Sequence, residues 1–172
     1  MILSEIISRE KKNVFVSAWT DEKPKRKDYP LSCKAGGRFP LTRKWRWTTV
    51  GFDVSGSSYR IMVAYHKDVP EYQAVLGECD GADTKVLARL EYHAAHPIVG
   101  WHIHAVCKDG AEVEAGVMKP HGQRRLPDAR SHHRRNQYLD GFSLSEESMN
   151  DNMALDIAAK WFGFKHQTSW SI

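Results

Sequence analysis

The chain has 172 residues, of which 41% are hydrophobic and 10% aromatic, and its formal net charge is +4 at pH 7. This length and composition exclude wholesale disorder and predict a single domain, residues 1–172, that is large enough to bury a core. No apolar run approaches the roughly 20 residues of a membrane helix, and the N-terminus lacks the basic segment and cleavage site of a secretory leader, so we expect a cytoplasmic protein without membrane contact.

The first half of the chain predicts a short helix followed by β-structure. Apolar spacing indicates a helix over residues 3–12, and residues 13–20 are typical of a strand. A long basic loop of about 21–44 follows. Alternating or apolar runs separated by turn residues then predict strands at 45–53, 59–66, 72–79, 85–92, 98–107 and 111–118.

The second half ends in a loop and a helix. Residues 119–137 contain two prolines and no periodicity, which predicts a second basic loop. Ser145 or Asp151 can cap a final helix. Its apolar stripe is Met149, Met153, Ile157, Trp161 and Phe164. The expected fold is therefore α+β: an antiparallel meander of about five or six strands packed by a C-terminal helix and a short N-terminal helix.

Basic residues are concentrated in two segments. Residues 23–46 carry nine Lys or Arg and one Asp, residues 119–135 carry six and one, and the remainder of the chain has a net charge of −9. This segregation predicts a polyanionic partner, RNA more than DNA, and also an acidic protein inhibitor that covers the basic surface. The expected phosphate-binding residues are Lys25, Arg26, Lys27, Arg43, Lys44, Arg124, Arg125, Arg130, Arg134 and Arg135.

Seven of the nine histidines lie between His93 and His133. His102 and His104 are two residues apart on a predicted strand, so they share one face of the sheet. Pairing of 98–107 with 111–118 through an Asp-Gly turn would bring other histidines to the same rim. One histidine can take a proton from a ribose 2′-hydroxyl while a second donates one to the leaving oxygen. We therefore expect a small nucleic-acid-acting protein, a metal-independent ribonuclease of toxin or defence type, with His102 and His104 as proton-transfer residues and His121 or His133 as their partner.

Two alternatives remain open. Zn²⁺ is commonly held by three histidines in catalytic sites, and His93, His102 and His104 could supply them for a hydrolase, with Glu91 or Glu114 orienting a ligand. Alternatively, Trp45 and Trp47 could stack on unpaired bases in a non-catalytic nucleic-acid-binding protein.

Two resemblances bear on these alternatives. The stretch from Gly100 to His104 resembles the metal loop of JAMM-type isopeptidases, but Ala105 replaces the proline of that loop and the downstream Ser-x-x-Asp is missing, which excludes the family. The general plan, a small basic β-rich domain with clustered histidines, is similar to ribonuclease toxins of bacterial toxin–antitoxin modules. That resemblance assigns no individual residue.

Overall fold

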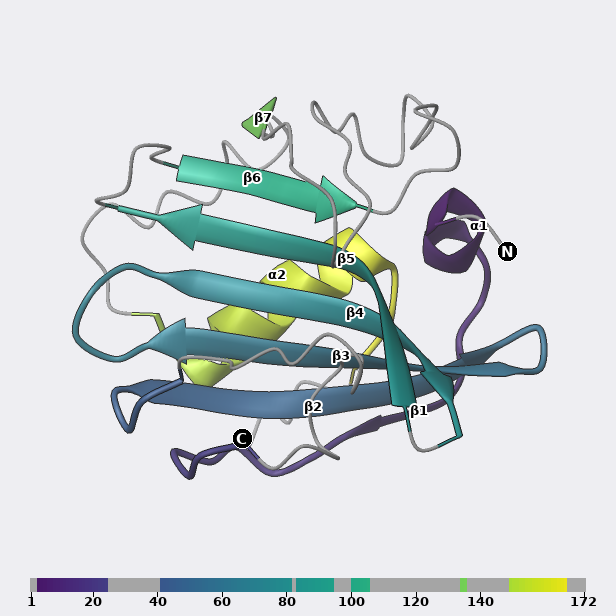
Figure 1. Ribbon diagram of the computed structural model, residues 1–172, viewed down its shortest axis with the longest axis horizontal. Coiled ribbons are helices and arrows are strands. Elements are labelled where there is room, and N and C mark those ends of the chain that lie inside the picture. Colours follow the sequence, from purple (N-terminus) through teal and green to yellow (C-terminus); the bar gives the residue numbers. More distant parts are fainter. Residues whose placement is uncertain are drawn as a thin grey trace, which may run out of the picture.

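A computed structural model describes residues 3–24, 41–81, 83–94, 100–105, 134–135 and 149–166. Within these ranges, seven strands form one antiparallel sheet in which each strand pairs with its neighbour in sequence. The strands are β1 (Lys12–Val16), β2 (Trp45–Val54), β3 (Ser57–His66), β4 (Tyr72–Asp80), β5 (Asp83–His93), β6 (Gly100–Ala105) and β7 (Arg134–Arg135) (Figure 1). The predicted α+β meander is confirmed.

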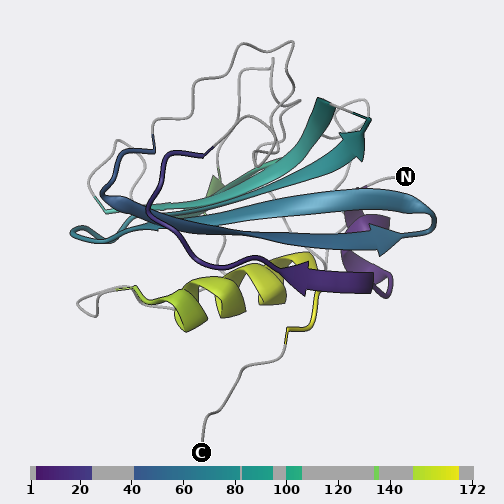
Figure 2. The same cartoon turned by 90° about the horizontal axis from the view of Figure 1, so that it is seen from below.

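Helix α2 (Asp151–Phe162) packs under one face of the sheet, as the two layers in Figure 2 show. Asn150 caps it by accepting the backbone N–H of Met153, so the predicted caps Ser145 and Asp151 were wrong. Gly163 ends the helix in the left-handed conformation, with φ of 65°. A Cβ atom at Gly163 would lie 2.3 Å from the Ile7 carbonyl oxygen, so only glycine fits there.

Helix α1 (Leu3–Ser8) is shorter than the predicted 3–12. It packs beside α2 and contributes Leu3, Ile6 and Ile7 to the main core. The chain turns away after Ser8, and Lys11 donates to the carbonyls of Ile7 and Arg9 at the end of the helix. Strand β1 then ends at Val16, four residues earlier than predicted, with an isolated bridge from Thr20 to β2.

The main core lies between the sheet and α2. Alternate residues of the strands face the helix, and the register aligns four aromatic residues across β3, β4, β5 and β6: Tyr65, Tyr72, Tyr92 and Trp101. The Tyr72 hydroxyl donates to the Ala154 carbonyl of α2 at 3.1 Å. The predicted apolar stripe of the C-terminal helix packs in this core, with Ile157 fully buried.

The meander continues differently from the prediction beyond β6. Residues 102–103 pair with Arg134–Arg135 and not with 111–118, which lie outside the described residues. The predicted loop 119–137 therefore includes a short strand. A strand of two residues is too short for an alternating pattern to appear in the sequence.

Neither helix in the described ranges has the length and apolar character that a membrane crossing requires.

Candidate functional site

The face of the sheet opposite α2 carries a group of polar side chains around one buried carboxylate. Gln73 on β4 and Arg89, Glu91 and His93 on β5 form what we call the Glu91 cluster. Register places Gln73 directly opposite Glu91, and residues two apart on a strand share a face. This is the face toward the viewer in Figure 1, where α2 lies behind the sheet.

Glu91 is the centre of the cluster. Its side chain is only 5% exposed, whereas Arg89 is 34% exposed and His93 22%. Gln73 Nε2 donates to Glu91 Oε1 at 2.5 Å, and Arg89 Nε lies 3.1 Å from the same oxygen. His93 Nε2 lies 3.9 Å from the other oxygen, Oε2. A buried carboxylate is thus in contact with an amide donor, a guanidinium and an imidazole, of which the last two are partly exposed.

Two buried polar atoms beside Glu91 have no hydrogen-bond partner among the described residues: Gln73 Oε1 and Arg89 Nε. The Arg89 N–H lies close to the carboxylate but is not directed at it, so this contact is an ion pair without a hydrogen bond. Nearly all buried polar groups in folded proteins are paired, and each exception calls for an explanation. Here one unpaired acceptor and one unpaired donor flank the same carboxylate.

The backbone of β6 brings the predicted histidines to this cluster. His102 occupies the register position opposite Glu91, and His104 the position opposite Arg89. Arg135 of β7 is in turn opposite His102. Trp101 packs in the main core, and the shared face expected for His102 and His104 stays a prediction, since their side chains lie outside what the structure describes.

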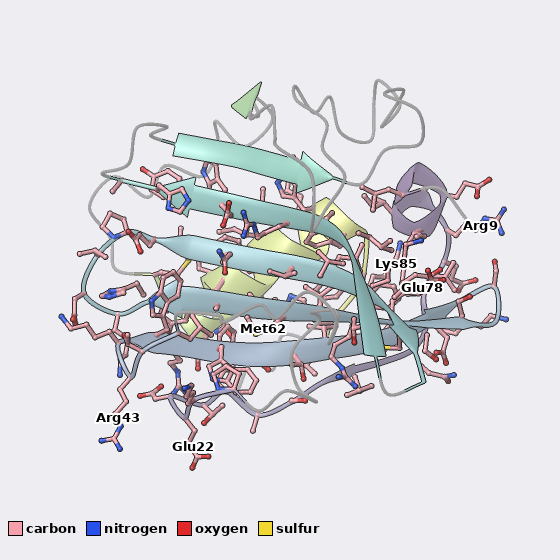
Figure 3. All side chains as sticks on the ribbon, in the orientation of Figure 1. Arg9, Glu22, Arg43, Met62, Glu78 and Lys85 are labelled. Carbon is pink, nitrogen blue, oxygen red and sulfur yellow. The ribbon has the colours of Figure 1, made fainter. Side chains whose placement is uncertain are left out.

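The other predicted site residues fall into two groups. His121, His133, Lys25, Arg26, Lys27, Arg124, Arg125 and Arg130 lie outside the described residues. Arg43 is exposed and points away from the sheet (Figure 3), and Lys44 pairs with Asp68 at 3.3 Å on the surface. These two cations directly precede β2, which is three strands from β5 and Glu91.

The two tryptophans of β2 lie on the same face as the Glu91 cluster. Trp47 is buried against Leu41, Met62 and Ala64, and its indole N–H donates to the Glu22 carbonyl at 2.6 Å. It is therefore part of a second, smaller core and offers no free ring for stacking. Trp45 is half-buried beside it.

The predicted zinc ligands are spread along the strands. His93 is opposite Gly100, whereas His104 is opposite Arg89, four residues further along β5. That offset is about 13 Å along the strand direction, while Zn–N bonds are only about 2.0–2.1 Å. This spacing does not favour one ion held by His93, His102 and His104 together. Among the side chains that the structure describes, which do not include those of His102 and His104, no three His, Cys, Asp or Glu residues are grouped as a metal site.

A second ionic group, here called the Asp151 cluster, joins the start of α2 to the sheet. Arg46 binds both oxygens of Asp151, at 2.8 and 2.9 Å, and Tyr65 donates its hydroxyl to Asp151 at 2.7 Å. Asp21 accepts from Arg46 at 3.1 Å and from Lys67 at 2.9 Å. Burial and the bond to Asp151 raise the pKa of Tyr65, and the bonds from Lys67 and Arg46 lower the pKa of Asp21. One cation of the predicted basic segment, Arg46, thus binds α2 to the sheet.

Sequence reasoning missed Gln73 and Arg89, and it named Glu91 and His93 only as metal-site residues. A signal was present in the alternation of polar and apolar residues along β5. Arg89, Glu91 and His93 alternate with Ala88, Leu90 and Tyr92, so one face of an interior strand is polar. Such alternation is ordinary in an antiparallel sheet with one covered face, and it is the burial of Glu91 on the polar face that singles out the cluster.

No protein-family model, curated protein or solved structure shows a significant match to this chain. The site must therefore be interpreted from its own chemistry.

Proposed function

We propose that the protein cleaves RNA at the Glu91 cluster by acid–base catalysis that requires no metal ion. The observation that carries this proposal is the buried Glu91 carboxylate, in contact with Arg89 and His93 and in register with His102. Carboxylate, imidazole and guanidinium are the groups that transfer protons and stabilise charge in phosphodiester cleavage.

The reaction assigns one role to each group. Glu91 takes the proton of the ribose 2′-hydroxyl, the 2′-oxygen forms a bond to phosphorus, and the bond from phosphorus to the 5′-oxygen breaks. Protonated His102 donates a proton to that leaving oxygen, which yields a 2′,3′-cyclic phosphate and a 5′-hydroxyl. Arg89 Nε, a buried donor in need of an acceptor, binds a phosphoryl oxygen and stabilises the charge that develops there.

The location of the cluster suits this chemistry. A carboxylate with little exposure sits in a medium of low dielectric constant, where a neighbouring cation interacts with a bound phosphate more strongly than in water. His102 and Arg135 occupy register positions in the same row of the sheet as Glu91, and the proposal assigns both residues to this site. The basic segments 23–46 and 119–135 would supply the general attraction to a polyanion.

The proposal is tested by incubating end-labelled single-stranded RNA with the purified protein in excess EDTA and mapping the product ends. We expect cleavage with 2′,3′-cyclic phosphate ends, and we expect it to be lost in His102→Ala. The matched control is His166→Ala, which removes a histidine that pairs with Asp156 of α2 and lies outside the cluster.

The alternatives give different results in the same assay. Cleavage that appears only when Zn²⁺ is added back would replace this proposal with a metal-dependent hydrolase. RNA that is retained in a gel but never cut, with or without metal, would identify a non-catalytic binding protein.

A further inference from the structure

The unpaired acceptor of the Glu91 cluster, Gln73 Oε1, has no role in the cleavage step described above. We propose that Gln73 determines substrate specificity: its Oε1 accepts a hydrogen bond from an N–H or O–H group of a nucleotide beside the scissile phosphate. This inference rests on the proposed function, since it places the scissile phosphate at Glu91 and Arg89.

The orientation of the Gln73 amide is fixed by its neighbour. Nε2 donates to Glu91 Oε1 at 2.5 Å, and the reversed amide would bring two acceptor oxygens together. Oε1 is therefore the end that is left over, and it is buried without a partner among the described residues. One of the two Nε2 hydrogens is bound to Glu91, and the atom of the amide without a hydrogen-bond partner among the described residues is the acceptor Oε1.

The position of Gln73 restricts what it can contact. Gln73 and Arg89 both approach the same oxygen of Glu91, so their unpaired atoms lie within one nucleotide of each other. A phosphate bound at Arg89 Nε places the adjoining sugar and base within reach of Gln73. The reacting 2′-hydroxyl cannot be the donor, since its proton goes to Glu91.

Two groups on RNA have the required chemistry: the 2′-hydroxyl of the nucleotide that follows the scissile phosphate, and the exocyclic amino group of a flanking base. Each has a substrate that lacks the donor. A deoxynucleotide after the cleavage point removes the hydroxyl, and uracil in place of cytosine replaces an amino group with a carbonyl oxygen.

The experiment measures kcat/KM for short substrates that differ only at these groups, in the wild type and in Gln73→Met. We expect the wild type to prefer one donor-bearing substrate by about 10- to 100-fold, because an analogue without the donor leaves the buried acceptor unpaired. In Gln73→Met that ratio falls to about 1. The readout is a ratio because loss of the Nε2 bond to Glu91 slows every substrate equally and leaves selectivity unchanged.

Each outcome decides the matter. The two substrates that differ at the ribose and the two that differ at the base show which donor binds Gln73 Oε1. A wild type without either preference, or a Gln73→Met variant that keeps the wild-type ratio, overturns the inference and leaves the cleavage activity standing. If the wild type cleaves nothing, the proposed function fails by itself. The same ratios are then measured as affinities for analogues with a 2′-deoxy group at the cleaved nucleotide, and equal affinities would overturn the specificity role as well.

Discussion

The sheet carries two groups in which an arginine meets a carboxylate, and they differ in how completely their hydrogen bonds are made. In the Asp151 cluster, Arg46 binds both oxygens of Asp151, and Tyr65 donates a further hydrogen bond to Asp151. Asp21 accepts hydrogen bonds from Arg46 and from Lys67. In the Glu91 cluster, the carboxylate is more deeply buried, yet Arg89 Nε and Gln73 Oε1 have no hydrogen-bond partner within the described part of the chain. A satisfied network stabilises the fold, whereas unsatisfied polar groups at greater burial cost stability, which is consistent with the binding role proposed for the Glu91 cluster.

The largest expected effect is on activity. Glu91→Gln keeps the shape of the side chain but removes the proton acceptor, so we expect RNA cleavage to fall by about 10²–10⁴-fold. The loss of stability should be smaller than in Asp151→Asn, because the Arg89 guanidinium that is left without its carboxylate is 34% exposed and its Nε makes no hydrogen bond to Glu91. The control is Glu78→Gln at the other end of β4, where the carboxylate accepts the Tyr59 hydroxyl at 3.4 Å. Equal losses in the two variants would contradict a catalytic role for Glu91.

The next effect is on stability. Asp151→Asn breaks the paired bonds with Arg46 and weakens the contact with Tyr65, so the free energy of unfolding should fall by about 1.5–3 kcal/mol. Cleavage per folded molecule should remain within about threefold of the wild type, since the cluster lies on the α2 side of the sheet. Urea unfolding and kcat/KM measured on one sample separate the two quantities. A Glu91→Gln variant that loses more stability than Asp151→Asn would reverse the comparison.

Lys11 is a third case, a half-buried cation that donates only to backbone carbonyls. Burial lowers its pKa from 10.5 to about 8, so between pH 8 and 10.5 the unfolded chain binds more protons than the native protein. Stability should therefore rise with pH across that window. In Lys11→Met the rise should be reduced. Unfolding by urea from pH 7.5 to 9.5 measures it as the difference in slope between the wild type and Lys11→Met, in which the titration of tyrosines and cysteines cancels. An unchanged slope would show that Lys11 is not its source.

The smallest effect concerns Asp21, which is the most exposed member of its cluster, 43% exposed. Asp21→Asn should cost about 0.2–1 kcal/mol at pH 7, and less at high salt. The bonds from Lys67 and Arg46 lower the pKa of Asp21 below 3.8. Its contribution is thus complete above pH 3.8 and is lost as the pH falls through the lowered value. The wild type and variant should converge in stability at low pH; a difference that persists there would have another origin.

The sequence predicts the fold better than the site, for physical reasons that particular residues illustrate. Alternation along 59–66 and 85–92 sets the strands, because a half-buried sheet demands that period. Ser55 and Gly56 both adopt positive φ, as the tight turn between β2 and β3 requires. The Glu91 cluster depends on which strands pair and in which register. Strand pairing involves residues far apart in the sequence, and no local pattern specifies it. Gln73 lies 18 residues from Glu91 and is in no motif with it.

The proposed role of the β6 histidines depends on a residue of the same strand that packs in the main core. Trp101 packs against Tyr72 and Tyr92, with ring centroids 5.3 and 5.1 Å apart, and thereby fixes β6 against β5. Since side chains alternate, a slip of β6 by one residue would exchange the two faces and carry His102 and His104 into the α2 core. An aromatic residue that takes no part in the proposed reaction thus fixes the register on which the proposed site depends. Substitutions of Trp101 would then resemble active-site mutations in an assay, although the residue never meets the substrate.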